Sequence, residues 1–61
     1  DSEDMYLNRT LVVQGASASL YTKAETGQLF LALTINDFAV QICGNVSEQE
    51  IIEVAENLKV N

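Results

Sequence analysis

The sequence predicts an α+β fold, an antiparallel meander of about four strands with one C-terminal helix packed on one face. Three observations favour this fold. Residues 9–43 consist of short apolar or alternating runs, each bounded by a glycine or by an Asn-Asp pair. From residue 47 onwards the spacing of apolar residues changes from two to about 3.6. A chain of 61 residues that is 48% hydrophobic and 20% charged has the composition of one small globular domain.

The first two strands are predicted on either side of Gly15. The run "RTLVVQ" at residues 9–14 is rich in β-branched residues, and "ASASLYTK" at residues 16–23 alternates small apolar with polar side chains. A glycine between two such runs is typical of a tight hairpin turn. Residues 1–8 begin acidic and show no sustained period, so we interpret them as a flexible end and residues 9–61 as the domain.

The third and fourth strands, residues 28–34 and 38–43, are predicted to pair through a tight turn at Asn36 and Asp37. In the third strand the leucines share one face, while phenylalanine, alanine and threonine share the other. That second face is less polar than a solvated face, so we expect something to cover it. Cys43, the only cysteine, ends the alternating fourth strand and is interpreted as a packed thiol.

The segment 47–58 has the local signals of a capped helix. Ser47 is suited to be the N-cap, and Glu50, three residues later, completes a capping box. The apolar residues fall on one stripe and the glutamates outside it, so we interpret the carboxylates as a solvated face and not as a catalytic or metal site. Lys59 is expected near the negative end of the helix dipole.

The predicted core joins the inward residues of the last two strands to the stripe of the helix. It comprises Leu29, Leu31, Leu33, Phe38, Val40, Ile42, Ile51, Val54, Ala55 and Leu58. One helix covers only one face of a sheet, which leaves the other face available for a partner protein, a homodimer or an upstream segment. The residues predicted for this possible interaction face are Tyr21, Phe30 and Ala32.

The composition disfavours several classes of function. The chain has no histidine to activate a serine, its three glycines are isolated, and one cysteine cannot form a zinc site or a redox pair, so we expect no catalysis, no cofactor and no metal. A net charge of −6 disfavours nucleic acid as a partner. We also expect no direct membrane insertion, because no apolar run approaches the roughly 20 residues that span a bilayer.

Three segments in order, "VVQGASASLY", "LFLALTINDFAVQICGNVS" and "EIIEVAENL", carry a resemblance to a known family. The chain resembles a domain of unknown function found at the C-termini of membrane-anchored proteins of Gram-positive, often clostridial, bacteria. Such domains are similar in places to sensory or anti-sigma-like modules. The resemblance implies an extracytoplasmic location in the cell envelope, a membrane-anchored parent of which this chain is a fragment, and a regulatory or partner-binding role.

Two functional hypotheses follow for the chain. The first is a noncatalytic extracytoplasmic interaction or regulatory module that binds a protein partner or a second copy of itself. The alternative is a domain that binds a small ligand or a lipid in a pocket between the sheet and the helix. A large apolar cavity at that place would favour the alternative, whereas a tightly packed interface would exclude it.

Overall fold

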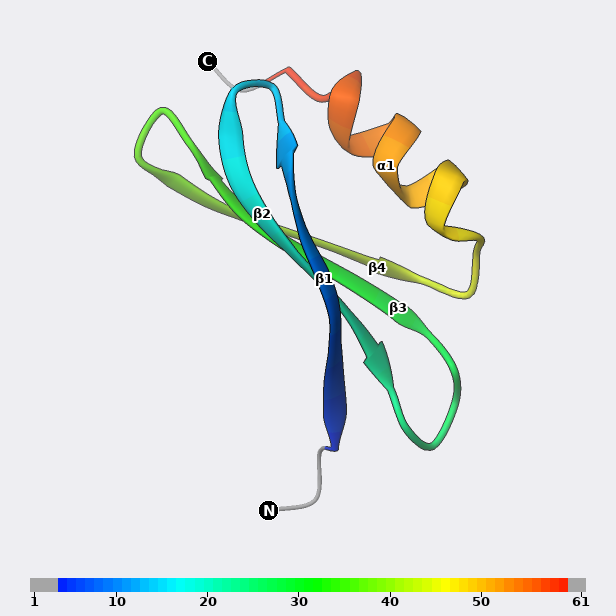
Figure 1. Cartoon of the computed structure of the whole chain (residues 1–61). Coiled ribbons are helices and arrows are strands. Elements are labelled where there is room, and N and C mark those ends of the chain that lie inside the picture. The colour runs from blue at the N-terminus through cyan, green and yellow to red at the C-terminus, as the bar shows by residue number, and fades with distance from the viewer. Residues whose placement is uncertain (1–3, 60–61) are drawn as a thin grey trace.

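The computed structural model describes residues 4–59 and contains one four-stranded sheet and one helix. The elements are β1 (Met5–Val13), β2 (Ala16–Lys23), β3 (Leu29–Ile35), β4 (Phe38–Gly44) and α1 (Glu48–Glu56). Neighbouring strands pair antiparallel in the order β1-β2-β3-β4, and α1 lies against one face of the twisted sheet (Figure 1). The predicted meander with a C-terminal helix is therefore confirmed.

The first strand begins at Met5, four residues before the predicted start. Met5 pairs with Lys23, and the register then shifts between Leu7 and Arg9, so that Asn8 is the extra residue of a β-bulge. Residues 5–8, which we assigned to a flexible end, are thus part of the sheet, and residues 1–3 lie outside the described residues. Pairing with β2 extends the strand beyond the region that local composition favours.

Both two-residue hairpin turns have the backbone that such turns require. Gln14 and Gly15 join β1 to β2 with φ values of 52° and 77°, and Asn36 and Asp37 join β3 to β4 with φ values of 51° and 68°. Two successive residues with positive φ make a type I′ turn, whose twist matches that of the flanking strands. The turns predicted at Gly15 and at the Asn-Asp pair are confirmed.

The core lies between α1 and the face of the sheet that it covers. Its buried residues are Val13, Ala18, Leu20, Leu29, Leu31, Leu33, Ile51 and Ala55, while Val40 and Ile42 are partly buried against them. The leucines of β3 and the two helical residues match the prediction, and Leu58 is half-buried. The prediction omitted the contribution of β1 and β2, because it placed the core in the last two strands.

Two predicted core residues are exposed, so the prediction was wrong for Phe38 and Val54. Phe38 is 53% exposed because it begins β4 at the hairpin end of the sheet, which the nine-residue helix does not cover. Val54 is 54% exposed because the helix is rotated. At about 100° per residue, its buried face is centred near Ala55 and includes half-buried Ile52, which leaves Val54 on the opposite flank.

Candidate interaction surfaces

The face of the sheet opposite α1, called here the outer face, holds the predicted interaction residues. Tyr21 and Phe30 are direct cross-strand partners on β2 and β3. Their ring centroids are 6.4 Å apart with an interplanar angle of 76°, an edge-to-face contact. Ala32 lies two residues along β3 and therefore points to the same face. The structure thus brings all three residues together, each half-buried by its neighbours.

The aromatic pair belongs to a longer row that crosses all four strands. Leu7 pairs with Tyr21, and Cys43 pairs with Phe30, so one residue of each strand contributes to the row. Leu7 is 55% exposed, and the sequence analysis missed it because it assigned the first eight residues to a flexible end. Cys43 is exposed as well, since β4 is an edge strand, so its interpretation as a packed thiol was wrong.

The outer face is almost free of charge, in contrast to the rest of the molecule. The four strands contain no Asp or Glu, and their basic residues are Arg9 and Lys23. Arg9 points towards the helix, which leaves Lys23 as the charged side chain that the described strands place on the outer face. An uncharged sheet face with exposed apolar side chains can contact another apolar surface without burying an unpaired carboxylate.

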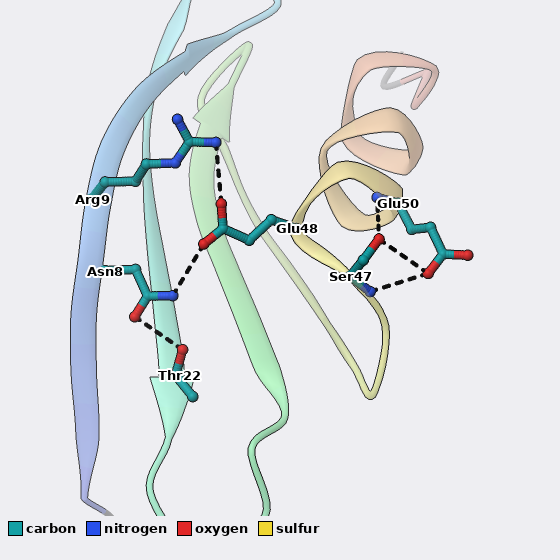
Figure 2. Close-up of polar contacts among 6 residues, drawn as sticks. All are labelled: Asn8, Arg9, Thr22, Ser47, Glu48 and Glu50. Carbon is teal, nitrogen blue, oxygen red and sulfur yellow. Dashed lines mark hydrogen bonds and ion pairs between the residues drawn. The ribbon is translucent and has the colours of Figure 1, made fainter.

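The other face is organised around the first turn of α1 (Figure 2). Ser47 is the N-cap: its Oγ accepts from the backbone N–H of Glu50 at 3.2 Å, and its own N–H donates to Oε1 of Glu50 at 3.0 Å. This reciprocal capping box, predicted from the sequence, satisfies two backbone donors at the helix start. Glu50 is therefore explained by the local structure of the helix.

Glu48 connects the same turn to β1, a contact that no local signal predicts. One carboxylate oxygen lies 3.3 Å from Nη2 of Arg9, and the other accepts from Nδ2 of Asn8 at 3.4 Å. Asn8 in turn accepts from Oγ1 of Thr22 at 2.9 Å (Figure 2). Since Asn8 is the bulged residue, the bulge places two successive polar side chains of β1 within reach of the helix start.

The end of α1 is held by Gln14 from the β1–β2 turn. Its Nε2 donates to the carbonyl oxygens of Leu58 at 2.7 Å, Ala55 at 2.8 Å and Glu56 at 3.3 Å. Ala55 and Glu56 belong to the last turn, whose carbonyls lack the usual partner four residues ahead in the helix, and the N–H of Leu58 also donates to Ala55 at 3.3 Å. The Gln14 side chain thus contributes to the C-terminal cap. The last turn contains no basic residue, because α1 ends before Lys59. At the negative end of the helix dipole, where we expected Lys59, the contact is made by the uncharged amide of Gln14.

An open groove runs between β4 and the flank of α1 that faces away from β1. Its volume is about 370 Å³. It is lined by Ile42, Cys43, Gly44, Val46, Glu50, Ile51, Glu53 and Val54. Most of these side chains are apolar, and the two glutamates are its charged members. The exposure of Val46, 43%, and of Val54 shows that the groove opens to solvent and is not an enclosed cavity.

The described residues provide no arrangement suited to metal chemistry. Among residues 4–59, no group of three or more His, Cys, Asp and Glu side chains is placed to hold a metal ion. Within the same range no helix combines the length and apolarity needed to cross a bilayer. The surfaces that remain as candidates are the outer face and the groove.

The chain was compared with models of known protein families. The family model DUF4367, a domain of unknown function, matches residues 2–58. The chain belongs to the DUF4367 family. The expectation that the chain is a domain of unknown function is confirmed, and the match covers every strand and the helix of this DUF4367 domain. Searches of curated proteins and of solved structures each found no match.

Proposed function

We propose that this DUF4367 domain is a noncatalytic interaction or regulatory module whose outer face binds another protein. One observation carries the proposal, the uncovered row of Leu7, Tyr21, Phe30 and Cys43 across the four strands. Burying apolar surface contributes about 25 cal/mol per Å², so a face that exposes such a row gains from being covered. The module is proposed to act outside the cytoplasm, in the envelope of a Gram-positive bacterium, with a membrane-anchored parent, and the family resemblance supports this location.

The distribution of charge supports the same surface. The carboxylates of the described residues lie in turns, at Asp4 and on the helix, so the acidic side chains of residues 4–59 lie outside the four strands that form the outer face. A partner that contacts this face meets Lys23 as its charged neighbour. The partner is either a different protein or a second copy, and two copies could meet through their outer faces with both helices pointing outwards.

Sedimentation equilibrium over a wide concentration range tests whether two copies of the domain associate. Co-sedimentation with partner proteins of the proposed membrane-anchored parent tests whether the outer face binds a different protein. Phe30→Lys places a charge in the centre of the row and is expected to abolish association while the circular dichroism spectrum stays unchanged. Leu7→Lys repeats the test at an exposed position that folding does not need to bury. Val54→Lys, on the opposite side of the molecule, is the matched control. Association that survives both outer-face variants would refute the proposal.

A second candidate function, binding of a small apolar ligand or a lipid, rests on the groove between β4 and α1. Its volume falls at the lower end of the range of about 300–1,000 Å³ that is typical of ligand sites. The fluorescence of N-phenyl-1-naphthylamine, a neutral apolar probe, should then rise on binding. Val54→Lys should remove the signal and Phe30→Lys should not. A probe that shows no saturable signal would exclude this candidate.

A further inference from the structure

The two edges of the sheet differ in how they are protected against pairing with another strand. β1 carries the bulge at Asn8 and the charged Arg9, both of which disfavour an added strand. β4 has neither device: its sequence FAVQICG contains no charge and no proline, and its register with β3 is continuous from Phe38 to Gly44. β4 is therefore the edge that can accept a further strand.

The register identifies which backbone groups of β4 are free to pair. In a hairpin with a two-residue turn, the residues next to the turn exchange both backbone hydrogen bonds, and bonded pairs then alternate along the strands. Phe38 pairs with Ile35 in this way. The backbone N–H and C=O groups of Ala39, Gln41 and Cys43 therefore point outwards. Among the described residues β4 ends the strand order, and no strand pairs with these groups.

An antiparallel copy of β4 is an added strand that uses the whole of this edge. Two identical antiparallel strands are related by a two-fold axis, so the residue on the axis pairs with its own copy. β4 has seven residues, and Gln41 is the central one. With the axis at Gln41 all seven residues are paired, and Ala39 of each copy meets Cys43 of the other. The free backbone groups of the two strands then face one another, so the edge is self-complementary.

The distribution of charge suits a second copy at this edge. A charged residue on the axis would meet an equal charge, whereas the carboxamide of Gln41 both donates and accepts hydrogen bonds. Glu50 and Glu53 line the groove beside the Gly44 end of β4. Antiparallel pairing places these glutamates of the two copies at opposite ends of the paired strands. In a chain of net charge −6, this uncharged strand is a surface that a second copy can approach.

The same register brings a residue of the second copy to the groove. Phe38 of one copy falls opposite Gly44 of the other. Val40 falls opposite Ile42. These positions lie on the helical face of the sheet, because they alternate with the outer-face residues of β4. They form non-hydrogen-bonded pairs, in which the side chains of two strands approach most closely.

Gly44 leaves room for the ring of Phe38. A Cβ added at Gly44 would meet no atom of the described residues within 4 Å, so the space above its backbone is open. An aromatic side chain on the neighbouring strand can cover such a glycine at a sheet edge. The exposed side chains of Val46 and Val54 line the same groove and offer the ring apolar contacts. Phe38 itself is 53% exposed in the single chain.

We propose that two copies of the domain pair antiparallel through β4, with Gln41 on the two-fold axis and Phe38 of each copy seated in the groove of the other. A fully covered aromatic side chain buries roughly 150–250 Å², so the two half-exposed rings together add roughly 200 Å². Specific interfaces that bury less than about 1,200 Å² form weak, transient complexes. One pair of short strands belongs to this class, and we expect a Kd on the order of 100 μM.

Gln41→Cys in a Cys43→Ser background tests the register. Directly opposed residues of a bonded antiparallel pair have Cα atoms about 5.5 Å apart, within the range of roughly 4.4–6.8 Å that a disulfide spans. At about 3.4 Å per residue, the native Cys43 residues of the two copies would be roughly 14 Å apart, too far to be bridged. Oxidation by copper–phenanthroline should therefore link the variant into a dimer on a non-reducing gel and leave the native chain unlinked.

Two variants locate the interface by sedimentation equilibrium. Phe38→Ala removes the ring and should weaken association at least roughly tenfold. Gly44→Val occupies the space that the ring needs and should weaken association as much. Its melting temperature should not fall, because valine favours strands and its Cβ meets no described neighbour. Val12→Ala, which truncates an exposed residue of the other edge strand, and Phe30→Lys on the outer face should leave the Kd unchanged.

Salt should tighten the association. Asp37 precedes Phe38 and therefore approaches the groove of the other copy, where Glu50 and Glu53 stand. Raising the salt concentration from roughly 0.05 to 0.5 M screens this repulsion and should lower the Kd severalfold. A Kd that rises with salt would show that the contact is made by opposite charges and would contradict this register.

Three further results would overturn the proposal. The first is an absence of association up to on the order of 1 mM protein. The second is a Gln41→Cys variant that is linked no more readily than the native chain. The third is association that survives Phe38→Ala and is lost in Phe30→Lys, which would place the second copy on the outer face. The outer-face experiment is run in the Phe38→Ala background, where pairing through β4 is removed, so failure of one proposal leaves the other standing.

Discussion

The two sides of the helix are attached to the sheet in different ways. On the β1 side, Gln14 binds the carbonyls at the end of α1, and Glu48 at its start reaches Asn8 and Arg9. On the β4 side, the contacts are apolar and a groove of about 370 Å³ remains. A nine-residue helix is too short to cover a four-stranded sheet completely. The groove therefore remains on the side of the helix away from these polar contacts.

The rotation of the helix follows the same asymmetry. Glu48, which contacts β1, and half-buried Ile52 lie on one side of the helix axis. Val54 lies on the opposite flank and lines the groove. Because Ile51 and Ala55 are the residues that the helix buries against the sheet, an apolar side chain stays exposed beside the edge strand β4.

The largest effect on stability is expected from Ile51→Ala, which removes an apolar contact between the buried face of the helix and the sheet. Ile51 is 1% exposed, so the truncation should cost about 2–4 kcal/mol. That loss is comparable to the total stability of roughly 3–9 kcal/mol expected for a chain of this size. Urea denaturation followed by circular dichroism measures it. Val54→Ala, a truncation on the open flank, should change stability by less than about 0.5 kcal/mol. Equal losses would show that both flanks are packed.

Gln14→Ala should have the next largest effect, because it removes the donor that binds three carbonyl oxygens at the end of α1. We expect a loss of about 1–2 kcal/mol in urea denaturation. Gln14→Glu keeps the length of the side chain but cannot donate when ionised, so it should be at least as destabilising as alanine. A Gln14→Glu variant as stable as the parent would contradict the role of the amide as a cap.

Ser47→Ala tests the local cap, which does not depend on either side of the sheet. The variant should lose about 1 kcal/mol, because the N–H of Glu50 loses its acceptor. Ser47→Thr retains a hydroxyl and should stay within a few tenths of the parent, on the order of 0.3 kcal/mol. Thermal unfolding of the three proteins compares them. Should the threonine and alanine variants be equally unstable, the hydroxyl would not be the stabilising group.

The smallest effect is expected from the ion pair of Arg9 with Glu48, because both side chains are about half exposed. A double-mutant cycle with Arg9→Ala and Glu48→Ala should give a coupling energy of about 0.2–0.5 kcal/mol. Raising the salt concentration to roughly 1 M should reduce that coupling towards zero. A coupling energy as large as the loss of stability caused by Gln14→Ala would show that the start of the helix is held as firmly as its end, which would contradict this ranking.

The parts of the fold that depend on neighbouring residues could be predicted from the sequence. The hairpin turns, the leucine face of β3 and the capping box of Ser47 and Glu50 are each specified by residues a few positions apart. The outer face of Tyr21, Phe30 and Ala32 followed from the alternation of two strands.

The remaining features depend on contacts between distant parts of the chain. The bulge at Asn8 is a property of the pairing with β2, and without it the start of β1 and the exposed Leu7 could not be found. The cap by Gln14 joins residues 41 positions apart, and the contact of Asn8 with Glu48 joins residues 40 positions apart. Helical periodicity alone cannot fix how the helix is rotated against the sheet, so it put Val54 in the core.

Residue-resolved amide hydrogen exchange of the parent and of Gln14→Ala tests the central claim, that contacts on the β1 side hold the helix while the β4 side is open. Exchange in α1 is expected to accelerate roughly five- to thirtyfold in the variant, the equivalent of about 1–2 kcal/mol. Amides of Leu20 and Leu31 in the centre of the sheet should change less than those of the helix. The account would be contradicted if the helix amides of the variant exchanged at the parent's rate, or if their exchange accelerated no more than that of the sheet amides.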